Sequence, residues 1–313
     1  MLDNFFLSIQ AVLPMFLIMA AGMYIRKVGM ITEEQVKVFN KIIFIVCFPC
    51  LMFSNIYGKN ISGANVRIVG YTLLGVGIIY VLATIVVRAV EKDKRSRGAM
   101  IQAIYRSNVV IMGMSMVQNI FGSDVDISVT AILVTIVVPI YNMLAVITLE
   151  VYRGEKPKVG QVIKSIMTNP MIDGALVGIV AVIIGLKIPS FITSTIDTVS
   201  NSASPMALLM LGASFNIKSL SANKRNLTIC VIGRLIGAPL IGVILLCMAG
   251  IRGVPLVTAV AIFASPVSVT SYTMAQQMDS DGELAADCVI ASSLFSCLTM
   301  FIWVFILKSL GMF

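Results

Sequence analysis

The stretch Gly98-Ala-Met-Ile-Gln-Ala-Ile-Tyr-Arg-Ser-Asn-Val-Val-Ile-Met-Gly113 places three polar residues inside an apolar segment. Arg106 lies about 12 Å from the start of this segment if it is helical, at about 1.5 Å per residue. An arginine at that depth in a membrane is costly unless it faces protein or a water-filled cavity. Ser107 and Asn108 compete for backbone hydrogen bonds and tolerate a helix break. The stretch therefore predicts a membrane-spanning helix that is interrupted near its middle.

A second stretch, Phe263-Ala-Ser-Pro-Val-Ser-Val-Thr-Ser-Tyr272, carries a proline inside another apolar segment. Pro266 removes a backbone donor, and the hydroxyls of Ser265 and Ser268 can satisfy the groups that a break would free. Both stretches also have plainer interpretations. Arg106 would then reach the membrane surface or form a structural pair, and Pro266 would only kink its helix.

The composition of the whole chain is typical of a multi-span membrane protein. Of 313 residues, 58% are apolar and 12% are charged, and the mean hydropathy is +0.98. A soluble domain of this length needs more polar surface. The net charge of +8 comes mostly from residues between apolar segments, without the aromatic and basic stripe that binds nucleic acid strands. We expect a lipid bilayer as partner and no nucleic acid.

Apolar stretches of about 20 residues, the length that spans a membrane, occur ten times. The expected spans are 5–25, 36–57, 67–89, 99–121, 126–150, 168–187, 191–215, 227–249, 254–276 and 285–308. The fold class that we predict is therefore an all-α integral membrane protein with ten transmembrane helices.

Lysine and arginine residues are distributed unequally between the two sides of this arrangement, and Arg106 and Arg234 fall inside spans. Sixteen basic residues share one side: Arg26, Lys27, Lys37, Lys41, Arg88, Lys92, Lys94, Arg95, Arg97, Arg153, Lys156, Lys158, Lys164, Lys218, Lys224 and Arg225. Five lie on the other: Lys59, Arg67, Lys187, Arg252 and Lys308. Because basic loops stay in the cytoplasm, the bias predicts a cell inner membrane protein with both termini on the non-cytoplasmic side.

The two halves of the chain align when the sequence is shifted by 156 residues. Pro14-Met15 then meets Pro170-Met171, Gly22 meets Gly178, Gly29 meets Gly185 and Pro49 meets Pro205. Coincidence in a biased composition is the alternative. With five spans in each half, the second half enters the membrane inverted, and such repeats place a binding site where the halves meet. We predict a first repeat over 1–152, a cytoplasmic linker over 153–167 and a second repeat over 168–313.

Other polar and helix-breaking residues complete the candidate set. An amide in the middle of a membrane needs partners, so Asn142 is expected to face the bundle interior, for ligand contact or for helix packing. Ser292, Ser296 and Thr299 form a stripe that we interpret as packing. The expected helix breaks or hinges are Pro49, Gly113, Pro139, Pro205 and Pro266.

Several chemistries lack the residues that they need. The chain has no histidine, no nucleophile elbow and no metal-ligand spacing, so we expect no enzyme, metal or cofactor. Asp173, Asp197 and Asp287 lie near span ends, whereas an ion antiporter driven by paired carboxylates needs them at the midplane.

Five segments carry a resemblance to a known family, in order and at matching spacing. They are Phe39-Asn-Lys-Ile-Ile-Phe-Ile-Val-Cys-Phe-Pro-Cys-Leu-Met-Phe53, Arg106-Ser-Asn108 with Gly113, Val138-Pro-Ile-Tyr-Asn-Met-Leu144, Ser204-Pro-Met-Ala-Leu-Leu-Met-Leu-Gly212, and Ala264-Ser-Pro-Val-Ser-Val-Thr-Ser-Tyr-Thr-Met-Ala275 followed by Asp281-Gly-Glu-Leu-Ala285. Together they resemble the second, fourth, fifth, seventh and ninth helices of the auxin efflux carrier family.

The resemblance implies two inverted five-helix repeats whose broken helices cross at spans 4 and 9, as in sodium/bile-acid-symporter-like carriers. It implies elevator motion of a core (spans 3–5 and 8–10) against a scaffold (spans 1, 2, 6 and 7), and a homodimer. Plant members export the auxin carboxylate, and bacterial members are described as malate or malonate permeases. By position, Asn108 and Pro266 would lie at the crossing. The chain departs from the plant pattern because it lacks the long cytoplasmic loop and has no proline after Asn108.

We therefore expect a secondary transporter that moves a small organic anion, such as malate, malonate or an auxin-like acid, by alternating access. The substrate-binding residues would be Arg106, Ser107, Asn108, Asn142, Ser265, Pro266 and Ser268. A guanidinium and helix N-termini both favour negative charge. Coupling to sodium or protons stays open. The alternative is a membrane receptor or regulator that binds a ligand or lipid on the same scaffold.

Overall fold

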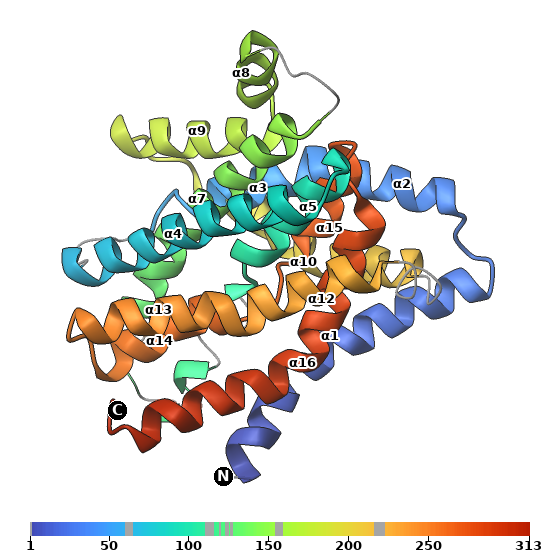
Figure 1. The fold of residues 1–313 in the computed structure, drawn as a ribbon. Coiled ribbons are helices and arrows are strands. Elements are labelled where there is room, and N and C mark those ends of the chain that lie inside the picture. The colour runs from blue at the N-terminus through green and yellow to red at the C-terminus, as the bar shows by residue number, and fades with distance from the viewer. Residues whose placement is uncertain are drawn as a thin grey trace.

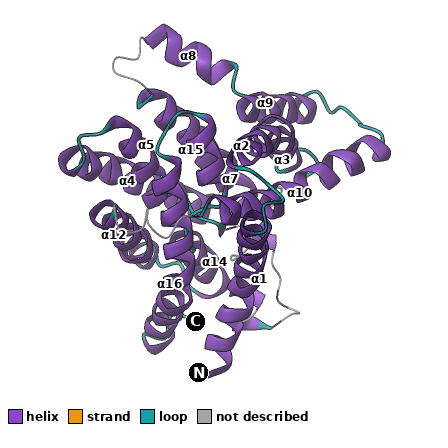
Figure 2. Cartoon of the chain, turned by 90° about the vertical axis from the view of Figure 1, so that its right-hand side faces the viewer, coloured by secondary structure: helices purple, strands orange, loops and turns teal. Residues whose placement is uncertain are grey.

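The computed structural model describes residues 2–59, 65–109, 116–118, 120–122, 125, 128–153, 159–215 and 223–313. Within these residues the chain is a bundle of helices with no strand (Figure 1). The two termini lie near one another at the same end of the bundle in both views (Figures 1 and 2).

Each range that was expected to span a membrane contains at least part of a described helix. The described helices, in chain order, are α1 (Leu2–Lys27), α2 (Glu33–Ile42), the π-helix η1 (Ile43–Cys47), α3 (Phe48–Ser54), α4 (Val66–Val90), α5 (Lys94–Tyr105), α7 (Ser128–Val151), α8 (Val159–Met167), α9 (Pro170–Ile183), α10 (Ser190–Ser214), α12 (Lys224–Ile232), the π-helix η2 (Gly233–Gly237), α13 (Ala238–Met248), α14 (Gly253–Ala264), α15 (Thr270–Gln277) and α16 (Gly282–Ser309). The expected linker contains α8, which lies at the edge of the bundle beside α7 and α9 (Figure 1).

Among the described residues, five helical stretches are long and apolar enough to cross a membrane. They are Glu33–Ser54, Val66–Val90, Ser128–Val151, Lys224–Met248 and Gly282–Ser309. Two shorter apolar helices are Pro170–Ile183 and Gly253–Ala264. Outward side chains such as Ile85, Ile183 and Phe191 are large, apolar and exposed, as expected where lipid covers the protein. The all-α class is thereby confirmed, the apolar helices are consistent with a membrane protein, and the count of ten spans stays a prediction.

The two helices that end at the predicted breaks lie in the interior. All residues from Gly98 to Tyr105 in α5 and from Leu256 to Ala264 in α14 are buried. A helix that is buried on every side belongs to the centre of a bundle. The peripheral helix α4, by contrast, exposes Leu74, Val81 and Ile85.

Aspartates at two helix N-termini fix how α5 enters the bundle. The Asp93 carboxylate accepts a hydrogen bond from the Ser96 amide (2.9 Å), and Asp281 accepts one from the Leu284 amide (3.0 Å). The Ser96 hydroxyl also lies 2.8 Å from the Asp281 carboxylate, so the starts of α5 and α16 are joined. Partial burial raises the pKa of Asp93, but the hydrogen bonds from Ser96 outweigh it and hold that pKa below its ordinary value.

Glycines allow two pairs of helices to approach very closely. A Cβ atom on Gly22 of α1 would overlap the Leu209 carbonyl of α10, and one on Gly178 of α9 would meet Phe53 of α3 at 3.4 Å. The 156-residue shift relates these two contacts, because it aligns Gly22 with Gly178 and Phe53 with Leu209. Small residues at helix crossings bring backbones together in this way in membrane proteins.

The glycines that end α1 and α9 also share one conformation. Gly29 has φ 76° and Gly185 has φ 65°, both in the left-handed region that glycine adopts without strain. These two positions are aligned by the same shift.

Replacing Gly22 with alanine should destabilise the protein, because the new methyl group overlaps backbone that cannot move independently of α10. Overpacking of this kind costs about 1–3 kcal/mol. Gly77 of α4 is the matched control, since nothing lies within 4 Å of a Cβ atom there. We expect Gly22→Ala to lower the melting temperature of the purified protein in detergent, and Gly77→Ala to leave it unchanged or raise it. Equal melting temperatures for the two variants would contradict the close packing.

Candidate functional site

The two interrupted helices meet backbone to backbone. α5 ends at Tyr105 and α14 at Ala264, and the residues that follow, Arg106 and Ser265, are extended. The Asn108 amide donates to the Pro266 carbonyl at 2.8 Å, and the Ser268 amide donates to the Arg106 carbonyl at 3.3 Å. Ser107 and Val267 face each other as an antiparallel bridge. Residues about 160 positions apart therefore form one central element.

Local chemistry explains why α14 stops where it does. Pro266 has no N–H and cannot continue the helix. The Ser265 hydroxyl donates to the Ala261 carbonyl at 2.5 Å, and the Val267 amide donates to the Ser292 hydroxyl at 3.0 Å. Ser292 was interpreted as a packing residue, but it satisfies a backbone group that the break leaves free.

Arg106 is buried beside this crossing, with 2% of its surface exposed. One terminal nitrogen donates to the Gln102 amide oxygen (3.4 Å) and to the sulfur of Met274 (2.9 Å). The other donates to the Thr270 hydroxyl (2.5 Å) and to the Asn142 amide oxygen. All four partners are neutral, and no carboxylate of the described residues forms an ion pair with this guanidinium. Among the residues that the structure describes, the positive charge of Arg106 therefore has no carboxylate partner.

Other donors in this region also contact weak acceptors. The Asn142 amide nitrogen donates to the Val138 carbonyl at 2.9 Å and lies 3.2 Å from the sulfur of Met52, and that of Asn108 lies 3.9 Å from the sulfur of Met15. A thioether is a poor acceptor. In the part of the chain that the structure describes, the Ser107 hydroxyl is buried without a hydrogen-bond partner. The crossing thus has more hydrogen-bond donors than good acceptors.

The residues proposed from the sequence fall into two groups. Arg106 and Asn142 are joined by a hydrogen bond, whereas Ser107, Asn108, Ser265, Pro266 and Ser268 form the paired breaks. The Ser268 hydroxyl lies 2.9 Å from that of Thr270, which binds Arg106.

Sequence reasoning missed three partners of Arg106, namely Gln102, Thr270 and Met274. The four-residue spacing from Gln102 to Arg106 was the available signal, because it places both side chains on one helix face. It also assigned no role to Arg234, a second buried arginine.

The expected hinge positions occupy different settings. Pro266 lies in a break, and Pro49 follows the π-helical turn η1. Pro139 and Pro205 lie inside α7 and α10, which continue through them, and their role as hinges stays a prediction. Gly113 lies outside the described residues.

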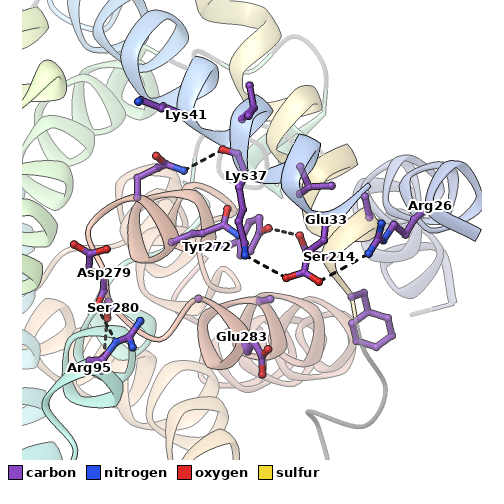
Figure 3. A pocket seen from close by; sticks show the side chains of 18 residues that line it. Arg26, Glu33, Lys37, Lys41, Arg95, Ser214, Tyr272, Asp279, Ser280 and Glu283 are labelled. Atoms are coloured by element: carbon purple, nitrogen blue, oxygen red, sulfur yellow. Dashed lines mark hydrogen bonds and ion pairs between the residues drawn. The ribbon is translucent and has the colours of Figure 1, made fainter. Parts of the chain in front are cut away.

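A cavity of about 850 Å³ is lined by residues of the side that is predicted to carry most of the basic residues, here called the basic face (Figure 3). The ends of α1 and α10, the starts of α5 and α16, and α2 and α15 surround it. Its charged lining comprises Arg26, Glu33, Lys37, Lys41, Arg95, Asp279 and Glu283.

Polar contacts across this cavity join α15 to α2 and α10. The Asn40 amide nitrogen donates to the Tyr272 hydroxyl (3.0 Å) and to the Gln276 side chain. The Tyr272 hydroxyl also bonds to Ser214 of α10 (Figure 3).

Helix α15 separates the cavity from Arg106. Thr270 and Met274 contact the guanidinium, whereas Tyr272 and Gln276 line the cavity. Residues two apart in a helix point about 200° from one another, so these pairs occupy opposite faces of α15. A ligand that travels from the cavity to Arg106 must pass α15 or displace it.

A comparison with protein families decides the identity of the chain. The sequence model described as "Membrane transport protein" matches residues 7–304, almost the entire chain. The chain belongs to this family, the auxin efflux carriers. It is a transmembrane protein of a transporter family rather than of an enzyme class.

Two archaeal relatives agree with this assignment. An uncharacterized transporter of Methanothermobacter thermautotrophicus is 23% identical over 305 residues, covering 95% of this chain and 97% of that protein. An uncharacterized transporter of Methanocaldococcus jannaschii is 22% identical over 315 residues, covering 96% and 99%. The likeness thus extends over nearly the full length of both relatives.

Replacing Thr270 with valine should destabilise the carrier, because it removes an oxygen acceptor from the buried guanidinium and conserves the volume of the side chain. A buried donor left without a partner costs about 1–3 kcal/mol. Thr195 is the matched control, since it is exposed and its hydroxyl bonds to its own helix. We expect a lower melting temperature for Thr270→Val than for Thr195→Val. If both variants melt like the native protein, Thr270 does not support Arg106.

Proposed function

We propose that this carrier moves a small organic anion, with a carboxylate bound to Arg106 beside the paired helix breaks. The observation that carries the proposal is the buried guanidinium whose described partners are all neutral. Arg106, Asn108 and Asn142 contribute the donors, and Ser107 contributes a hydroxyl that has no hydrogen-bond partner among the described residues.

The energetics of Arg106 favour an anionic ligand. Holding an unpaired charge away from water costs several kcal/mol. A carboxylate offsets this cost by accepting two parallel hydrogen bonds from a guanidinium. Binding would exchange the weak contact with Met274 for a charge-assisted bond, so the site gains most from a ligand that brings negative charge.

The cavity on the basic face supports a route to this site. Its lining includes four cations (Arg26, Lys37, Lys41 and Arg95) and three carboxylates (Glu33, Asp279 and Glu283), so its net charge of +1 favours anions. The positive-inside rule makes this face cytoplasmic and places both termini on the opposite side. The inner membrane is then the expected location.

Alternating access between two bodies is the mechanism that we propose. The core would hold the crossing, and α1, α2, α3, α9 and α10 would form the scaffold. The hydrogen bonds from Asn40 and Ser214 to Tyr272 run between these bodies and would break when the core moves. The related contacts of Gly22 and Gly178 support inverted repeats over 1–152 and 168–313, joined by the 153–167 linker.

Uptake into proteoliposomes tests the proposal. Labelled malate, malonate and an aromatic carboxylate would be offered with and without imposed sodium and proton gradients. We expect saturable uptake of at least one of them. Arg106→Ala should reduce it about a hundredfold, because a charge-assisted hydrogen bond contributes about 1.5–3 kcal/mol. Arg106→Lys should retain part of it.

The matched control is Arg88→Ala, which removes an exposed arginine near the end of α4 and should transport normally. Native uptake by Arg106→Ala would show that this guanidinium does not hold the substrate. Ligand binding without flux under any gradient would favour a receptor on the same scaffold.

A further inference from the structure

The second buried arginine, Arg234, has no role in the proposed anion site. It lies in the π-helical turn η2 with 0% of its surface exposed. Its guanidinium has five N–H donors, and each is directed at a backbone carbonyl. Nε donates to Ser265 (2.9 Å), Nη1 to Ile104 (3.1 Å) and Tyr105 (2.9 Å), and Nη2 to Ile262 (3.0 Å) and Phe263.

These five carbonyls belong to the C-terminal ends of both interrupted helices. Ile104 and Tyr105 are the last residues of α5, while Ile262, Phe263 and Ser265 lie at the end of α14. The final carbonyls of a helix lack intrahelical partners and carry a partial negative charge. Where two such ends meet in the interior, their partial negative charges together favour binding of a cation.

Other transporters built from inverted repeats bind a cation at helix ends of this kind. Unwound carbonyls and half-helix C-terminal ends coordinate a coupling Na⁺ or proton. Here the guanidinium of Arg234 fills the same kind of position. Its five bonds use all of its donors, so those carbonyls bind the charge of a side chain and not that of a soluble ion.

We propose that Arg234 is a fixed internal cation, which takes the place of a soluble cation and ties the end of α5 to the end of α14. The consequence for transport rests on the proposed function: the crossing needs no Na⁺, and the two broken helices move together. Arg234 is a positioning residue, because it contacts the backbone of the crossing and leaves the anion to Arg106.

The chain is shaped around this guanidinium. A Cβ atom at the preceding Gly233 would lie 3.1 Å from the side chain of Ile104, so α5 passes close to η2. The π-helical turn disturbs regular helix bonding, and the Leu235 carbonyl in that turn accepts a hydrogen bond from the Trp303 indole at 3.0 Å. Single π-helical turns are frequent at functional sites.

Chemical rescue tests the proposal on purified protein. Ethylguanidinium contains the atoms that Arg234→Ala removes beyond Cβ. We expect Arg234→Ala to melt several degrees below the native protein, and ethylguanidinium chloride to raise its melting temperature saturably. Choline chloride at equal concentration should not. The native protein and the Arg88→Ala control should show no such difference, and Na⁺ should not stabilise the native protein relative to choline.

Two outcomes would overturn the proposal: equal effects of ethylguanidinium and choline on Arg234→Ala, or specific stabilisation of the native protein by Na⁺. If Arg234→Ala does not fold, the melting temperature of Arg234→Lys tests the proposal instead. Lysine keeps the charge but has three donors, so this variant should melt below Arg88→Lys, and equal melting would refute the role of the five bonds. These readouts need no transported substrate. Failure of the proposed function would instead appear as absent flux in every variant.

Discussion

Backbone groups that leave a helix inside a membrane must find new partners, because lipid offers none. In this carrier the two interruptions satisfy part of that need with each other, through the bonds of Asn108 to Pro266 and of Ser268 to Arg106. Ser292 satisfies another freed amide, and Arg234 takes five freed carbonyls. The position of the candidate site follows from these hydrogen bonds, because Arg106 is the first residue after α5, at one of the two breaks.

The two buried arginines show how the surroundings of one chemical group decide its use. Arg234 contacts backbone carbonyls at helix ends, which cannot turn away without unwinding the helices. Arg106 contacts side chains of Gln102, Asn142, Thr270 and Met274, which can rotate to other partners. A guanidinium held by backbone is suited to structure. One held by neutral, rotatable groups can exchange them for a ligand.

Much of the fold could be predicted from the sequence, because hydrophobicity has a simple physical origin and a fixed length scale in membranes. The break after Tyr105 was visible as Arg106-Ser-Asn108, and the break at Pro266 as a proline among hydroxyl residues. Pro139 and Pro205 carry the same signal, yet α7 and α10 continue through them. A proline shows that one backbone bond is lost and does not say whether neighbours hold the helix together.

The site could be predicted only in part, because its partners come from distant positions. Asn142 was found from its amide in an apolar span. Arg234 is likewise a polar residue in an apolar span. Its acceptors, however, are backbone carbonyls up to 130 residues away, and every residue has such a carbonyl, so the sequence does not distinguish them. The contacts of donors with Met15, Met52 and Met274 are equally invisible, because methionine in an apolar span indicates packing.

The proposed anion site depends on the buried charge of Arg106, which has no carboxylate partner among the described residues. The most direct test is an experimental structure of the carrier with a brominated aromatic carboxylate, or with whichever labelled carboxylate the protein transports. We expect ligand density whose carboxylate lies within hydrogen-bond distance of the Arg106 guanidinium, with the Met274 sulfur displaced. Ligand density confined to the basic-face cavity, with all four present partners of Arg106 retained, would contradict it.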